Sequence, residues 1–312
     1  MHLIPYDTHV DFVGKQRIAL AITLLLTFIS LGALAVRGLN FGIDFTGGVL
    51  IEVGYPGPAD LGAIRETLTD AGFENPQVQS FGSATDVLIR LLPSDVTSSA
   101  NEVRDHMLEV LRETTPDVEL RRVDFVGPQV GEDLTEQGGL AMLFATLMIL
   151  AYVAFRFQWK FAVGSVVALV HDVLITVGFF ALFGLPFDLS VLASVLAVIG
   201  YSLNDTVVIF DRIRENFLKI RKKPAAEIVN VSINETLART IMTGVTTLMV
   251  LVVLFLLGGE TLRGFSVALI VGILVGTYSS VYVASSVALA LKVTTVDLMP
   301  PQPTEKDADS MP

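Results

Sequence analysis

The sequence contains few charged residues and no cysteine. Only 17% of its 312 residues are charged, whereas 52% are hydrophobic. This balance excludes an ordinary soluble domain and is typical of an integral membrane protein. The lack of cysteine means that the redox compartment cannot be inferred from thiols or disulfides. No stretch matches the G-x-x-x-x-G-K-[ST] phosphate loop, so the chain by itself is not expected to use ATP.

Six apolar runs are long enough to cross a bilayer, which takes about 20 residues. They cover 18–36, 139–155, 161–184, 189–210, 240–258 and 264–291. The first run is longer than the roughly 7–15 apolar residues of a signal-peptide core, which favours an uncleaved anchor. Basic residues gather in alternate connections, so we expect both termini on the cytoplasmic side.

The spans divide the chain into five parts. We expect a cytoplasmic tail over 1–17, a first transmembrane helix over 18–37, an extracytoplasmic domain over 38–137, transmembrane helices 2–6 over 138–292 with a basic cytoplasmic loop at 211–235, and a cytoplasmic tail over 293–312. The segment 37–139 holds 7 basic and 18 acidic residues and so carries the whole net charge of −11.

The predicted fold class is an α-helical polytopic membrane protein with an α+β, ferredoxin-like extracytoplasmic domain. Strands are expected at 49–55, 77–82, 85–92 and 118–126, and helices over 58–72 and within 94–115. Their order is β-α-β-β-α-β. Residues 127–139 are expected to link this domain back to the membrane.

The polar segment shows no sign of catalysis. Its only histidine is His106, and it has no Ser/His/Asp or metal-ligand spacing. A docking or substrate-contacting role is therefore favoured. GIDFTGG (42–48) lacks the phosphate-loop lysine, and we interpret it as a glycine-rich join between the first span and the first strand.

Ionisable residues inside membrane spans are costly, and they usually face the bundle interior. Asp205 lies in the fourth span, about 10 Å before the basic anchor at Arg212 by helical rise. Arg239 begins the fifth span at a similar depth. The two are expected to face each other as a carboxylate–guanidinium pair.

The fifth span carries a stripe of small polar residues. Its members recur at helical spacing: Thr236, Arg239, Thr240, Thr243, Gly244, Thr246 and Thr247. The stripe predicts either tight helix packing or a hydrated, proton-carrying face, in which Thr240 and Thr243 would support the ion site.

A short pattern, S-x-N-acid-T, occurs at both 202–206 and 232–236. It is either a chance echo or a sign that Asn204 and Asn234 mark two helix ends around one cytoplasmic mouth.

The third and sixth spans hold further polar or small residues. His171 and Asp172 lie near mid-bilayer and either bridge helices or take part in ion movement. Adjacent helical residues point about 100° apart, so these two are not expected to pair with each other. Gly272 and Gly276 form G-x-x-x-G, a motif for close helix contact.

Four motifs together resemble a known family. They are GIDFTGG after the first span, GPQVG before the second, GYSLNDTVVIFDRIREN in the fourth and SINETLARTIMT in the fifth. They are similar to SecF, the small subunit of the bacterial SecDF protein-export factor in the resistance-nodulation-division superfamily.

The resemblance implies a six-span half-transporter in the bacterial inner membrane that pairs with SecD. It would act with the SecYEG channel and the SecA motor, using the proton-motive force to draw preproteins outward. In that family the Asp of NDT and the Arg of RT are tied to proton movement, and they match Asp205 and Arg239. No cofactor and no nucleic acid are implied. The transported ion is a proton, with sodium as an open alternative.

Two other functions remain open at this point. A small-solute exporter of the same superfamily should carry an apolar or aromatic pocket in its outer domain. A passive scaffold of a membrane complex should tolerate neutral residues at Asp205 and Arg239.

Overall fold

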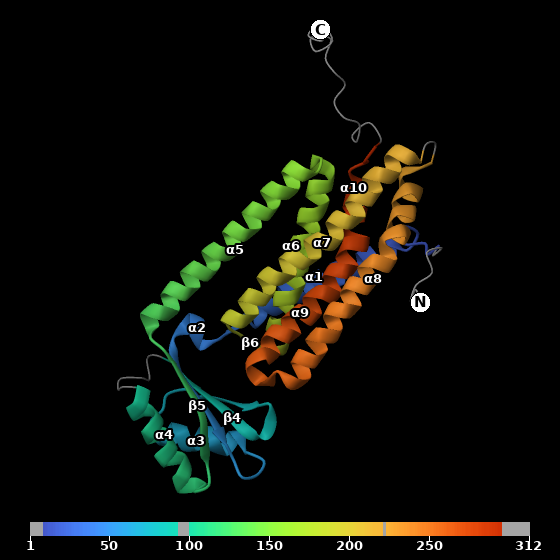
Figure 1. Ribbon diagram of the computed structural model, residues 1–312. Coiled ribbons are helices and arrows are strands. Elements are labelled where there is room, and N and C mark those ends of the chain that lie inside the picture. Colours follow the sequence, from blue (N-terminus) through green and yellow to red (C-terminus); the bar gives the residue numbers. More distant parts are fainter. Residues whose placement is uncertain (1–8, 93–99, 221–222, 295–312) are drawn as a thin grey trace.

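The computed structural model describes residues 9–92, 100–220 and 223–294. Most of the expected N-terminal tail, nearly all of the C-terminal tail, the first residues of the segment 94–115 and two residues of the basic loop lie outside this part of the chain. A helix bundle carries a small α/β domain at one end (Figure 1).

Six helical segments of the described chain are long and apolar enough to cross a membrane, which confirms the predicted number. They are α1 (Gln16–Val36), α5 (Pro128–Arg156), α6 (Trp159–Phe183), α7 (Leu189–Lys219), α8 (Ala225–Leu257) and the last segment, in which α9 (Gly259–Ser279) continues through a π-helical turn, η2 (Ser280–Ala284), into α10 (Ser285–Ala290).

Helices α7 and α8 extend well beyond their apolar runs. The charged residues that follow the fourth run and precede the fifth are good helix formers, so composition alone does not end either helix. Ion pairs at i, i+4 support these ends, joining Lys219 to Glu215 and Lys223 to Glu227. The predicted basic loop is therefore mostly helix, with a short turn between α7 and α8.

The expected linker 127–139 is also helical. Gly127 is extended and Pro128 occupies the first turn of α5, a position where proline is favoured because its missing N–H has no helical partner. The start of α5 then packs closely on α2 (Ile43–Thr46). A Cβ on Gly131 would lie 2.8 Å from the backbone nitrogen of Gly47. The domain thus joins the second span through packed helix.

The α/β domain has the predicted β-α-β-β-α-β order. Its elements are β2 (Gly48–Gly54), α3 (Leu61–Asp70), β3 (Gln77–Phe81), β4 (Ser83–Leu91), α4 (Ala100–Thr114) and β5 (Glu119–Val126). The strands form one antiparallel sheet in the order β3-β4-β2-β5.

Alternation along the strands builds the domain core. Val49, Ile51 and Val53 of β2 are completely buried, while the residues between them point to the other, half-open face. The buried side chains pack against apolar residues of α3 and α4, including Leu68 and Met107. Both helices therefore cover one face of the sheet (Figure 1).

The domain is attached to the bundle through the segment after α1. Strand β1 (Asn40–Phe41) pairs in parallel with β6 (Pro186–Phe187) in the α6–α7 turn. Arg90 of β4 donates to the Phe41 carbonyl, and Arg122 of β5 donates to the Thr261 hydroxyl at 3.0 Å. The half-open face of the sheet thus looks toward the helix ends.

GIDFTGG acts as this join, as interpreted from the sequence. Gly48 has φ +119°, a conformation that L side chains rarely adopt, and a Cβ there would lie 2.2 Å from the Leu91 carbonyl oxygen. The glycine lets β2 leave the membrane surface and pair with β4 at once.

Replacing Gly48 with alanine should destabilise the α/β domain. Backbone strain and the clash with Leu91 together predict a loss of about 2 kcal/mol or more. Thermal unfolding and limited proteolysis of the detergent-purified protein measure it. Gly57→Ala is the control, because a Cβ at Gly57 meets open space. Equal stability of the two variants would contradict the assignment.

Candidate functional site: a buried carboxylate at the α7–α8 contact

Helix α7 presents Asp205 to the bundle interior. Asp188 caps its first turn by accepting from the backbone N–H of Val191 at 2.9 Å. From there buried residues recur every three or four positions, and Ser202 and Asp205 continue this stripe. Asp205 is only 3% exposed.

The carboxylate of Asp205 lacks a full set of partners. Its Oδ2 has no hydrogen bond to any described residue. The expected ion pair with Arg239 is not formed: no contact within 4.0 Å joins the two in the described chain, although the Arg239 charge is close enough to act on Asp205. Arg239 lies on the exposed side of α8. The sequence argument gave the correct depth for both residues but the wrong direction for the arginine.

Thr240, not Arg239, occupies the side of α8 that faces Asp205. It is 1% exposed, and its hydroxyl lies near the Asp205 carboxylate without meeting hydrogen-bond geometry. The Tyr201 hydroxyl, one turn earlier on α7, is also buried and unpartnered among the described residues. Buried polar atoms without partners are rare and costly, so their grouping at one helix contact marks a special site.

The rest of the threonine stripe behaves conventionally. Its hydroxyls donate to carbonyls of their own helix, three or four residues earlier, in Thr236, Thr243, Thr246 and Thr247. Both interpretations of the stripe therefore hold in part. Most of it serves helix packing, and Thr240 alone points a free hydroxyl at the carboxylate.

His171 and Asp172 form a second polar centre, and the expectation that they do not pair was wrong. His171 Nδ1 lies 2.9 Å from Asp172 Oδ1, because the two side chains bend toward each other despite their diverging Cα–Cβ bonds. Asp172 Oδ2 accepts from Ser202 of α7 and from Ser279 of α9, the latter at 2.7 Å. Asp172 thus bridges three helices.

Helices α7 and α9 approach closely along the predicted G-x-x-x-G motif. A Cβ on Gly272 would lie 2.1 Å from Val198, and one on Gly276 would lie 3.0 Å from the Cβ of Ser202. One turn further, the hydroxyls of Thr206 and Ser280 are 2.8 Å apart. Ser280 opens the π-helical turn, a feature found often at functional sites.

Asn204 and Asn234 do not share one mouth. Asn204 is exposed on α7. Asn234 instead holds the segment before α1, accepting from the Val10 N–H and donating to the Val10 carbonyl, both at 2.8 Å. Asn230 adds a bond from the Phe12 N–H at 2.8 Å. The sequence echo of 202–206 and 232–236 therefore has no common structural role.

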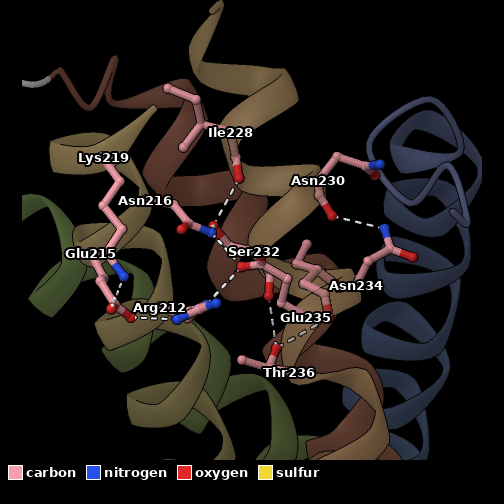
Figure 2. Close-up of polar contacts among 11 residues, drawn as sticks. Arg212, Glu215, Asn216, Lys219, Ile228, Asn230, Ser232, Asn234, Glu235 and Thr236 are labelled. Carbon is pink, nitrogen blue, oxygen red and sulfur yellow. Dashed lines mark hydrogen bonds and ion pairs between the residues drawn. The ribbon is translucent and has the colours of Figure 1, made fainter. Parts of the chain in front are cut away.

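A charged network joins the end of α7 to the start of α8 (Figure 2). Arg212 contacts Glu235 at 2.6 Å and Glu215 at 2.5 Å, and Asn216 donates to Glu235 and to Ser232. The sequence identified Arg212 only as a basic anchor. Its acidic partner comes from the next helix, so sequence spacing could not reveal it.

No ligand group for a metal stands out in the described ranges, where no cluster of three or more His, Asp or Glu side chains occurs. The chemistry that the site offers is protonation of a buried carboxylate beside a hydroxyl and within the field of one guanidinium.

Comparison with known proteins agrees with the resemblance noted in the sequence. The family model for "Protein export membrane protein SecD/SecF, C-terminal" matches residues 106–294, and the "SecD/SecF GG Motif" matches 32–55. The chain is 52% identical to the protein translocase subunit SecF of Pseudomonas aeruginosa, over 94% of this chain and 95% of that protein. It is 46% identical to SecF of Escherichia coli O157:H7, over 90% and 87%.

A solved structure shows the same arrangement of elements. The crystal structure of SecDF from Thermus thermophilus superposes with a TM-score of 0.84 at 39% identity, over 93% of this chain. The present chain spans only 40% of that SecDF chain. With six membrane-crossing helices, both matching family models and close curated relatives, this chain belongs to the SecF family of protein translocase subunits.

Proposed function

We propose that this chain is the SecF subunit of a membrane complex that uses the proton-motive force to promote preprotein translocation through the Sec channel. The observation that carries the proposal is the buried, unpartnered carboxylate of Asp205, within reach of the Arg239 charge, in a chain of the SecF family. A carboxylate in that setting can take up and release a proton as its surroundings change.

The partner that we propose for the exposed side of this site is SecD. Arg239 and Asn204 are exposed on the isolated chain at levels where α7 and α8 would lie in the bilayer. A charged side chain facing lipid is costly, so another protein should cover it. The SecDF neighbour, of which this chain spans 40%, leaves room for such a partner. SecYEG, SecA and the translocating preprotein complete the proposed machinery.

In the proposed mechanism, a proton on Asp205 removes its attraction for Arg239 and changes its contact with Thr240. Helix α8 then shifts against α7. The next turn, between α8 and α9, begins at Gly258 and contacts the α/β domain through Thr261 and Arg122. Together with the packed α2–α5 contact, this gives a path by which helix motion reaches the domain.

The proposed location is the bacterial inner membrane, with both termini in the cytoplasm and residues 38–137 outside. The basic residues support this topology. Arg156, Lys160, Arg212 and Lys292 all lie at the end of the bundle opposite the α/β domain, where Lys160 donates to the Lys292 carbonyl.

The exporter alternative is less well supported. The α/β domain has a half-open cavity of about 230 Å³ lined by Tyr55, Pro58, Ile64 and Leu111, and burial raises the pKa of Tyr55 to about 12. Small-molecule sites usually occupy roughly 300–1,000 Å³. The cavity is therefore small for a drug-like solute, and sodium as the coupling ion and a passive scaffold stay as outcomes of the tests below.

Asp205→Asn should abolish gradient-driven stimulation of translocation while the complex still assembles. The amide keeps the shape of the carboxylate but cannot exchange a proton. Translocation into vesicles that contain the SecD partner, with and without a collapsed proton gradient, measures the effect. A proton-coupling residue of this kind should lower the stimulated rate by about 100-fold or more.

Asp211→Asn is the matched control on the same helix. Asp211 is part-exposed and pairs with Arg156 at 2.9 Å, a contact expected to contribute about 1 kcal/mol or less. It should keep most of the activity. Full gradient-driven activity in Asp205→Asn would sink the coupling role and favour the scaffold, and a response to a sodium gradient alone would favour sodium.

Single cysteines should report the proposed topology, because the chain has none of its own. Gly57→Cys in the α/β domain should react with an impermeant maleimide on intact spheroplasts. Lys223→Cys in the α7–α8 turn should react only after the membrane is opened. The reverse pattern would overturn the orientation.

A further inference from the structure

Asp172 is more deeply buried than Asp205, with 1% of its surface exposed. Among the described residues, its one ion-pair partner within 4.0 Å is His171. A buried carboxylate is tolerated only when hydrogen bonds and a nearby cation or proton compensate for lost hydration. Its surroundings should therefore be specialised for holding it.

Three donors from three helices hold Asp172. His171 on α6 contacts Oδ1, while Ser202 on α7 and Ser279 on α9 both donate to Oδ2. Ser279 is the last residue of α9 before the π-helical turn η2. The wider turn directs consecutive serines to different partners, since Ser280 reaches Thr206 of α7. The carboxylate therefore joins α6, α7 and α9.

Ser202 lies three residues before Asp205, so the two side chains emerge on nearly the same side of α7. The bond from Ser202 to Asp172 fixes the turn of α7 that presents Asp205. On its other side, Asp205 meets Thr240 of α8 without a completed hydrogen bond. The polar contacts of α7 are thus complete toward α6 and α9 and incomplete toward α8.

The proton content of this centre is set by His171. Its Nδ1 faces Asp172, and its Nε2 is buried without a partner among the described residues. Helix α9 faces the ring with Tyr278, at a centroid distance of 6.4 Å. From α1 the Thr23 hydroxyl lies 3.1 Å from the Tyr278 hydroxyl, which donates to the Ala19 carbonyl.

The remaining neighbours complete the surroundings. Helix α7 contributes Ser202 and, one turn on, Asp205, and η2 contributes Tyr282, whose ring stacks on Tyr278 at 5.2 Å. The titratable groups that surround the pair are therefore two tyrosines and one carboxylate.

We propose that Asp172 and His171 are a positioning pair for the coupling step: they lock α7 to α6 and α9, so that protonation of Asp205 moves α8. The inference rests on the proposed function of Asp205. It assigns His171 and Asp172 to the rigid part of the machine, and it gives them an electrostatic influence on Asp205 through Ser202.

The pH profile of gradient-driven translocation tests this role in the complex with the SecD partner. Asp172→Asn keeps the shape of the side chain and an acceptor for both serines but removes the charge. We expect the pH midpoint to shift by about half a unit or more, because a buried charge near Asp205 has gone. His171→Gln should shift it as well.

Ser266→Ala is the control, because Ser266 on α9 is equally buried but donates to a carbonyl of its own helix. Its profile should match that of the unsubstituted chain. An unchanged midpoint in Asp172→Asn, whether the rate is normal or uniformly lower at every pH, would overturn the proposal.

A cross-link provides a second readout that does not depend on translocation. Thr206→Cys and Ser280→Cys place the only two thiols of the chain at the α7–α9 contact. Oxidative cross-linking of this pair in the assembled complex should be efficient. Adding Ser279→Ala should slow it by about tenfold, the effect of one lost hydrogen bond to a charged group.

Adding Ser266→Ala should leave the cross-linking rate unchanged. Equal rates with Ser279→Ala would show that Asp172 does not lock these helices and would overturn the inference. Because this measurement needs no proton gradient, it separates failure of the positioning pair from failure of Asp205 as the coupling residue.

Discussion

The close approach of α7 and α9 is the constraint on which the bundle depends. Gly272 and Gly276 leave no space for a side chain, so Val198 and Ser202 of α7 lie directly against α9. In a membrane, where lipid tails are as apolar as leucine, helices associate through such close packing and through hydrogen bonds between them. The short distance allows serine, with its small side chain, to reach Asp172 on a third helix.

A division of polar contacts follows from this packing. Toward α6 and α9, the polar side chains of α7 find partners on neighbouring helices. Toward α8, three buried polar atoms, on Tyr201, Asp205 and Thr240, have none among the described residues. A fully satisfied network makes a bundle rigid, whereas an incomplete one leaves alternatives of similar free energy. The chain therefore combines a fixed block with one contact that can change, which is the arrangement that a coupled motion needs.

The sequence was sufficient for features that depend on local composition. Six apolar runs gave six membrane helices, and alternation along the polar segment gave the order of the α/β domain. It gave the burial of Asp205 and the contact role of Gly272. It failed where a side chain had to choose between neighbours. Arg239 and Thr240 are adjacent, and only the packing of α8 decides that the threonine faces inward. Helix ends were also missed, because charged residues continue a helix as readily as they end one.

Asn234 and Asn230 bind the backbone of the segment before α1, not its side chains. Amide side chains that pair with peptide groups recognise the path of a chain and are indifferent to most of its chemistry. Residues 10, 12 and 13 can therefore vary widely among related chains while the contact persists. Proline is the exception, because it lacks the N–H that each asparagine accepts. Tolerance at these positions should thus follow the supply of backbone donors, and neither hydrophobicity nor charge should govern it.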